Sequence, residues 1–89
     1  MNAVAGSEVL GKGKDEIARW MADRLGAELG VPGETIDVTL PFAALGVTSI
    51  IGVSLAGDLA DELAIEVPPT LFWDYPTVEK LAEHLADLA

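Results

Sequence analysis

Apolar residues recur at helical spacing in three separate segments of this chain, and this period decides most of what it can fold into. Residues three or four positions apart lie on one face of a helix. The three rows are Ile17, Met21, Leu25, Leu29; Ile51, Leu55, Leu59, Leu63; and Val78, Leu81, Leu85, Leu88. The pattern therefore predicts three amphipathic helices, over about 15–29, 49–64 and 77–88.

Glycine and proline separate these helices. Gly30 and Pro32 end the first, and residues 30–48 form a long connection without a period. A loop of this length in a small domain is usually packed or functional. Its apolar residues, which we expect to lie against the core, are Val31, Ile36, Leu40, Phe42 and Leu45. Residues 70–74 predict a short helical turn, so the fold class is all-α: a four-helix bundle with three main helices, a short third helix and a long first loop.

Size and charge exclude several classes of function. The chain has 89 residues, which suffice for one compact core, and a formal net charge of -10. Four of its five basic residues lie in the first 24 positions, so the remainder is strongly acidic. Such a surface repels nucleic acid and anionic membranes and attracts partners with basic patches. We expect a monomeric domain that binds neither nucleic acid nor membrane.

The chain contains no cysteine, so a thiol used in its function must come from a cofactor. Residues 1–13 are small, polar and glycine-containing, and we interpret them as a flexible N-terminal linker or tail ahead of a domain at 14–89. They lack a basic region followed by a hydrophobic run, and no apolar stretch could span a bilayer, so we expect a cytoplasmic protein.

The second helix has apolar residues that its core face does not need. Ile50 and Val53 fall on the side opposite Leu55 and Leu59, and Asp58 lies near them. We expect Ile50 and Val53 to be exposed, because little else in a chain of this size can cover them. An exposed apolar patch with an acidic rim is typical of a docking surface. The alternative is that the short helix or the loop buries both.

Ser49 stands at the start of this helix, directly after Thr48, and has two interpretations. Either hydroxyl can cap the helix through its first N–H groups. Alternatively, the Ser49 hydroxyl points into solvent and is open to modification, and a phosphodiester there would gain from the helix dipole. On physical grounds alone, capping is the simpler explanation.

The motifs around Ser49 resemble those of acyl carrier proteins. Residues 45–50, Leu-Gly-Val-Thr-Ser-Ile, resemble the phosphopantetheine attachment motif of that family, and residues 41–45 resemble the lead-in found in polyketide synthase carriers. Downstream, residues 69–77 and 81–85 match the family's third-helix and fourth-helix motifs at the right spacing. The resemblance covers roughly residues 15–88.

This resemblance implies a non-catalytic carrier domain, with the fold of the four-helix carrier-protein bundle. Ser49 would carry a covalent 4′-phosphopantetheine derived from coenzyme A, which supplies the missing thiol and holds acyl or polyketide intermediates as thioesters. The implied partners are a phosphopantetheinyl transferase and synthase components such as a ketosynthase, an acyltransferase or an acyl-adenylate ligase. The implied docking residues are Thr48, Ile50, Val53, Asp58, Asp61 and Glu62.

The chain departs from the family at Thr48, where carriers usually have Asp, and this predicts either slower modification or the need for a dedicated transferase. Leu55 replaces the tryptophan of carriers that serve β-branching, and residues 54–59 and 72–76 look more like carriers paired with fatty-acyl-adenylate ligases. The alternatives are a peptidyl carrier of a nonribosomal peptide synthetase and an unmodified helical interaction domain in which Ser49 only caps. An enzyme is disfavoured, because no paired acid, base or nucleophile is evident.

The histidine and the two tryptophans are explained by ordinary structural roles. His84 has neither cysteine nor a second histidine to share a metal, so we expect a solvated side chain on the last helix. Trp20 and Trp73 are expected to pack in the core or at its rim. We predict no metal site, because the acidic residues of the second helix lack the glycine-bearing loop of a calcium site.

Overall fold

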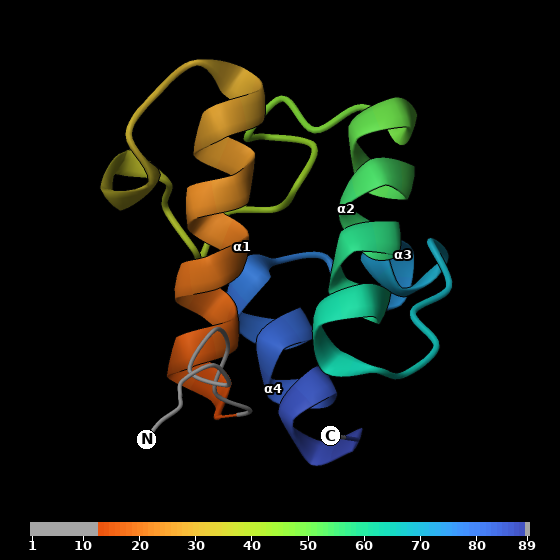
Figure 1. Cartoon of the computed structure of the whole chain (residues 1–89). Helices are drawn as coiled ribbons and strands as arrows, with labels where there is room; N and C mark the ends of the chain where they lie inside the picture. The colour runs from red at the N-terminus through yellow and green to blue at the C-terminus, as the bar shows by residue number, and fades with distance from the viewer. Residues whose placement is uncertain (1–12, 89) are drawn as a thin grey trace.

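A computed structural model describes residues 13–88 of the chain, which form helices joined by one long loop and shorter turns (Figure 1). In this part of the chain the only strand-like pairing is an isolated antiparallel bridge between Pro41 and Thr77. The all-α prediction is therefore confirmed. The elements are α1 (Lys14–Leu29), η2 (Gly33–Thr35), α2 (Ser49–Leu63), α3 (Leu71–Asp74) and α4 (Val78–Leu88).

Helix α1 ends as expected at Gly30, whose φ of 78° is the left-handed conformation that glycine adopts without strain. The chain then folds back onto the helix it has just left. Gly26 permits this, because a Cβ at that position would come within 2.5 Å of the Val31 carbonyl oxygen. The first part of the long loop, including η2, accordingly packs on α1.

The core lies mainly between α1 and α4, with the inner face of α2 closing it (Figure 1). The fully buried large side chains are Ile17, Met21, Leu25, Leu59, Leu63, Leu81, Leu85 and Val78. The predicted rows are thus largely right, with three corrections at their ends. Leu29 and Ile51 are only half-buried, and Leu88 in the last turn of α4 is 53% exposed.

The expectation that the loop's apolar residues pack on the core holds for only some of them. Phe42 is buried, and Ile36 and Leu45 are half-buried against the core cluster. Val31 and Leu40, in contrast, are exposed, at 43% and 40%. Only part of the loop's apolar surface is therefore used for stability.

Phe42 is the residue that fixes the end of the loop. Its ring meets that of Phe72 edge to face, with the centroids 4.8 Å apart. Its backbone N–H donates to the carbonyl oxygen of Pro76 at 2.7 Å, and its own carbonyl accepts from the Val47 N–H at 3.0 Å. The segment that leads into α2 is thereby held against the junction between α3 and α4.

The C-terminal helices begin and end near their predicted positions. Tyr75-Pro76 follows α3, since the residue before a proline is pushed away from helical geometry. Thr77 caps α4 as expected, because its hydroxyl accepts from the Lys80 N–H at 3.1 Å. Across residues 13–88, no helix is long and apolar enough to cross a membrane, and no cluster of three candidate metal ligands is present.

Candidate functional site

Two adjacent hydroxyl side chains stand where α2 begins, and the structure separates their roles. Thr48 is the N-cap residue, with extended backbone, and its Oγ1 accepts from the Ile51 N–H at 3.3 Å. Ser49 is the first residue inside the helix and is exposed. Capping is therefore explained by Thr48, and the Ser49 side chain is accessible to a modifying enzyme.

The turn before α2 brings this serine to the surface. Gly46 adopts a φ of 89°, which lets the chain reverse after the turn that begins at Pro41. Val47 and Thr48 then enter the helix, and Ser49 follows at its N-terminus. The free N–H groups and the positive end of the helix dipole lie at this end, so a phosphodiester on the Ser49 oxygen would sit in a favourable electrostatic field. The residues present thus fit a phosphate-linked group.

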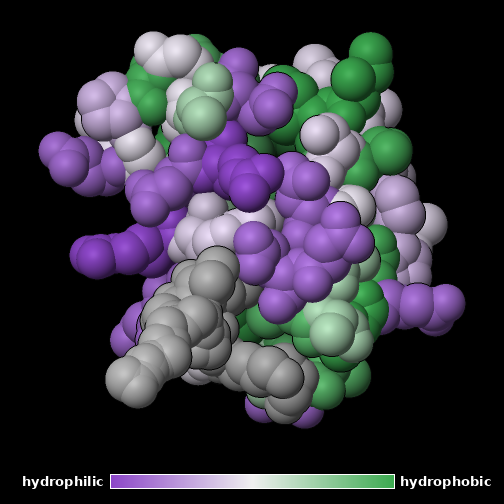
Figure 2. All heavy atoms as spheres, in the orientation of Figure 1, coloured by the Kyte–Doolittle hydropathy of each residue, from purple (hydrophilic) through white to green (hydrophobic). Residues whose placement is uncertain are grey.

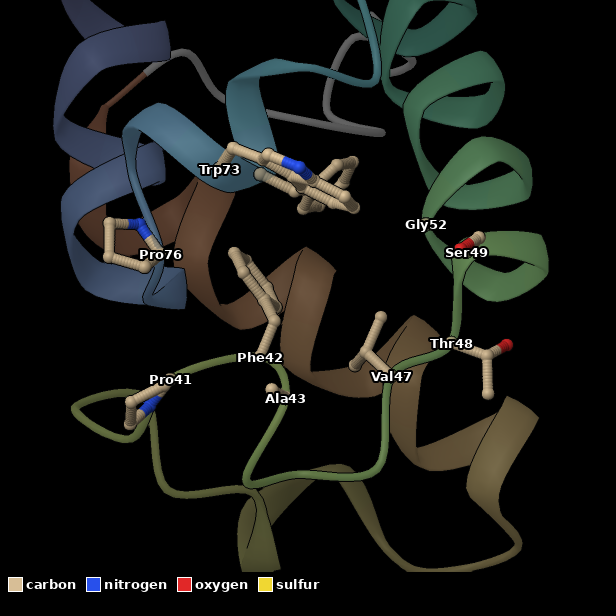
Figure 3. Close-up of a pocket in the computed structure, with 10 residues that line it drawn as sticks. Pro41, Phe42, Ala43, Val47, Thr48, Ser49, Gly52, Trp73 and Pro76 are labelled. Atoms are coloured by element: carbon tan, nitrogen blue, oxygen red, sulfur yellow. The ribbon is translucent and has the colours of Figure 1, made fainter.

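An open cleft of about 520 Å³ adjoins Ser49 (Figure 3). One wall is the end of the long loop together with the start of α2, and the other is α3 and Pro76, more than 15 residues further along the chain. Most of the lining is apolar, and the polar side chains lie at the α2 end. The lining residues are Pro41, Phe42, Ala43, Val47, Thr48, Ser49, Gly52, Phe72, Trp73 and Pro76.

Exposed apolar side chains flank the serine, as the sequence predicts. Ile50 is 82% exposed and Val53 is 56% exposed, so neither α3 nor the loop buries them. Hydrophobic residues gather over the first turns of α2, whereas the α1 side of the same view is mainly hydrophilic (Figure 2). The predicted exposure of both side chains is therefore confirmed, and their role in docking remains a prediction.

The acidic residues proposed for docking are not equivalent. Asp61 is exposed and Glu62 is half-buried on the outer part of α2. Asp58, however, accepts from Arg24 of α1 at 2.6 Å, and both side chains remain about two-fifths exposed. The Arg24 guanidinium also lies 4.7 Å from the ring centre of Trp20. Asp58 is thus held by a neighbour within the domain, while Asp61 faces solvent.

Trp73 is the site residue that sequence reasoning missed. It was expected to pack in the core or at its rim, but its side chain is 73% exposed and lines the cleft. The signal was available, because Phe72 and Trp73 are adjacent in a four-residue helix and cannot both face the core. Phe72 takes the buried position.

His84 also differs from the expectation of a solvated side chain. It is half-buried and stacks on Tyr75, with ring centres 4.2 Å apart and an interplanar angle of 13°. The pairing closes the turn between α3 and α4 from outside. His84 therefore contributes to packing.

Residues 19–85 match the family model described as the phosphopantetheine attachment site. The chain belongs to this family. Members of the family carry a covalently attached 4′-phosphopantetheine and are non-catalytic carriers. The match includes Ser49, α2 and the whole cleft.

Related sequences and structures agree with this membership. The carrier domain is 36% identical over 74 residues to a phenolphthiocerol/phthiocerol polyketide synthase of Mycobacterium tuberculosis, a match covering 83% of this chain and 4% of that protein. It is 39% identical over 64 residues to the 5-methyl-1-naphthoate synthase of Streptomyces sahachiroi, covering 72% of the chain and 4% of that protein. The carrier domain therefore spans a small fraction of the length of these relatives.

Solved structures of carrier proteins share the fold. A free-standing peptidyl carrier protein from Acinetobacter baumannii superimposes with a TM-score of 0.83 at 38% identity, covering 88% of this chain and 98% of that one. An acyl carrier protein from Anabaena, described as having a variant phosphopantetheinylation-site sequence, gives a TM-score of 0.82 at 29% identity, covering 89% and 90%. The expected four-helix carrier-protein bundle is thus confirmed.

Proposed function

We propose that this chain is an acyl carrier domain of polyketide synthase type, which bears its phosphopantetheine on Ser49. The observation that supports this most is that the two hydroxyl residues at the start of α2 have different roles. Thr48 caps the helix, and Ser49 remains exposed beside an open cleft, within the segment that matches the family. We place the domain at residues 14–89 with a linker at 1–13; residues 1–12 and 89 lie outside the described part of the chain.

The chain's own residues position the group. Ser49 supplies the oxygen that would be esterified by the phosphate, and Thr48 fixes the first turn of α2. The dipole of α2 stabilises a phosphate at its N-terminus by about 0.3–1 kcal/mol, which orients the group without holding it. When attached, the arm supplies a terminal thiol that carries acyl groups as thioesters. Tethering raises the effective concentration of each acyl group at a partner's active site.

The surface of α2 would meet these partners. Ile50 and Val53 provide apolar contact area next to the arm, and Asp61 and Glu62 steer partners with basic patches. The partners we propose are a phosphopantetheinyl transferase and, in turn, a ketosynthase, an acyltransferase or an acyl-adenylate ligase. These contacts must be small and short-lived, because one carrier has to leave each partner before it meets the next.

Modification of the purified domain tests the proposal directly. The domain is incubated with coenzyme A and a broad-specificity phosphopantetheinyl transferase, and its intact mass is measured. We expect one added phosphopantetheine, and none on Ser49→Ala. Ser54→Ala is the matched control, since Ser54 is also an exposed serine of α2, and it should be modified like the wild type. An arm that persists on Ser49→Ala would contradict the proposal.

A peptidyl carrier is the second candidate, and one observation favours it. The peptidyl carrier protein from Acinetobacter baumannii is 38% identical and superimposes over most of both chains. The relatives that are polyketide synthases support the acyl alternative. Offering the modified domain to an acyl-adenylate ligase and to an amino-acid-activating enzyme separates the two. Loading with amino acids alone would favour the peptidyl carrier.

A further inference from the structure

Arg24 and Asp58 form an ion pair that joins α1 to α2. The guanidinium Nη1 donates to the Asp58 carboxylate at 2.6 Å, and both side chains remain about two-fifths exposed. Within residues 13–88 it is the only salt bridge between side chains. The two helices lie side by side (Figure 1), so the pair brings a positive charge of α1 to the edge of the surface that α2 exposes.

Arg24 is held from a second side by Trp20. The two residues are four positions apart on α1, which places them on one face of that helix. The guanidinium carbon lies 4.7 Å from the centre of the Trp20 ring, and planar guanidinium groups stack on aromatic rings. Trp20 is itself half-buried against the core cluster. Because this neighbour restricts the rotamers of Arg24, less side-chain entropy is lost when the guanidinium pairs with Asp58.

The carboxylates of α2 face different directions. At about 100° per residue, Asp61 lies within about 20° of Ile50 around the helix axis, about three turns further along. Asp58 lies about 80° from Ile50, and its ion pair shows that it is on the side next to α1. Ile50 and Asp61 are both exposed. One exposed row therefore leads from Ile50, next to Ser49, to Asp61, and Asp58 lies at the edge of this row.

A basic side chain of a partner would meet these two carboxylates differently. Asp61 is exposed, and no other side chain within residues 13–88 forms a salt bridge with it. At Asp58, in contrast, an incoming cation has to displace Arg24 from its carboxylate. The cation is also repelled by Arg24 itself, since the two charges would lie within the Debye length of about 8 Å at physiological ionic strength. Selection between partners commonly uses such a repulsive element next to an attractive one.

We propose that Arg24 is a specificity-determining residue, which keeps Asp58 from basic partners and directs them to the row formed by Ile50 and Asp61. The partner is a protein with a basic patch, as charge complementarity to α2 requires, and the phosphopantetheinyl transferase is the first of these. The inference rests on the proposed function, because that function names the partners that α2 would meet. It adds that α1, through one side chain, takes part in choosing them.

Titration of tetralysine into the ¹³C-labelled domain tests this inference without any arm. The peptide supplies only the basic chemistry of a partner, and the carboxyl resonances of Asp58 and Asp61 report where it binds. We expect Asp61 to shift more than Asp58 in the wild type, and both to shift alike in Arg24→Gln. Arg19→Gln is the matched control, because Arg19 is an exposed arginine about 140° from Arg24 around α1. Equal shifts of the two carboxyls in the wild type would overturn the inference.

Transferase kinetics measure the consequence for a partner. We expect Arg24→Gln to raise kcat/KM about threefold at low salt, and the gain to disappear at high salt, because it comes from a screened charge. Arg24→Gln combined with Asp58→Asn should return to the wild-type value, since the released carboxylate is then absent. A gain that Arg19→Gln reproduces, or no gain in Arg24→Gln, would overturn the inference. Failure of the wild-type domain to gain an arm counts against the proposed function instead, and the tetralysine titration then decides the inference by itself.

Discussion

The seam between α1 and α4 and the first turns of α2 use apolar residues in opposite ways. Ile17, Leu25 and Leu81 in the seam are 0% exposed, whereas Ile50 at the start of α2 is 82% exposed. Both regions are helical and rich in aliphatic residues, so composition does not distinguish them. The two regions differ in whether another helix packs on their apolar residues. Helices α1 and α4 bury each other's apolar faces, while the outer face of α2 has no neighbour among the described elements. Buried apolar surface is thus concentrated in the seam and on the inner face of α2, and exposed apolar surface at the start of α2.

Shortening a buried side chain in the seam should cause the largest loss of stability. Leu81→Ala removes a fully buried side chain between α4 and α1, and we expect a loss of about 2–5 kcal/mol in the free energy of unfolding. Urea unfolding followed by circular dichroism measures it. A loss below about 1 kcal/mol would mean that the seam can collapse around the gap and is not the main source of stability.

The corresponding change at the start of α2 should spare the fold and reduce partner contact. Ile50→Ala is expected to change the free energy of unfolding by less than about 0.5 kcal/mol, because its side chain is mostly in water. We expect kcat/KM of the phosphopantetheinyl transferase to fall about tenfold, which corresponds to about 1.4 kcal/mol and to a contact weaker than a hot spot of about 2 kcal/mol or more. Leu88→Ala, also exposed but at the far end of α4, should leave this rate unchanged.

Thr48 has two roles at the start of α2, since it caps the helix and stands next to Ser49, the residue that we propose is modified. Thr48→Ala should cost about 1 kcal/mol of unfolding free energy through loss of the cap. Thr48→Asp keeps a capping oxygen and restores the residue usual in carriers, so we expect an unchanged fold and faster modification. Urea unfolding and transferase kinetics on the two variants measure both effects. An unchanged or lower rate for Thr48→Asp would refute this interpretation of Thr48.

Asp58 and Asp61 provide a smaller test of the same contrast. Because Asp58 pairs with Arg24 at a partly exposed position, Asp58→Asn should reduce the free energy of unfolding by about 0.2–1 kcal/mol, and the effect should shrink at high salt. Asp61→Asn should leave stability unchanged and slow association with a basic partner. Thermal melting at low and high salt, together with transferase kinetics, measures both. Equal stability losses in the two variants would remove the distinction between them.

The smallest expected effect lies in the long loop. The Thr39 hydroxyl donates to Asp37 at 2.6 Å and the Thr39 backbone N–H at 2.9 Å, and these bonds lower the pKa of Asp37 below its ordinary value of 3.8. A carboxyl whose pKa is lower in the folded state than in the unfolded state stabilises the fold at pH values above its unfolded-state pKa. This contribution is lost as the pH falls through its folded-state pKa. NMR titration of the Asp37 carboxyl should show the lowered pKa, and Thr39→Ala should raise it toward 3.8.

The three long helices could be predicted from sequence, because each buries one face and the period of Leu and Ile records it. The candidate site was only partly predictable. Ser49 followed from its motif, but two neighbouring hydroxyls at one helix start can each cap, and only the backbone geometry assigns that role to Thr48. The pairing of Arg24 with Asp58 joins residues 34 positions apart, so no local pattern reports it. The exposure of Trp73 depends on which of two adjacent aromatics α3 turns inward.

The contacts of Phe42 also fix the position of Ser49, the proposed attachment point. The ring of Phe42 packs against Phe72 and its backbone N–H donates to Pro76, so one end of the segment from Phe42 to Ser49 is held in place. The length of this segment then determines where the serine enters the helix. One inserted residue in that segment would change the position of Ser49 relative to the start of α2, or force the segment to bulge away from the core. Insertions and deletions should therefore be tolerated far less between Phe42 and Ser49 than at the exposed turn around Pro68. Related domains should accordingly differ in length at other positions and keep the number of residues between Phe42 and Ser49 constant.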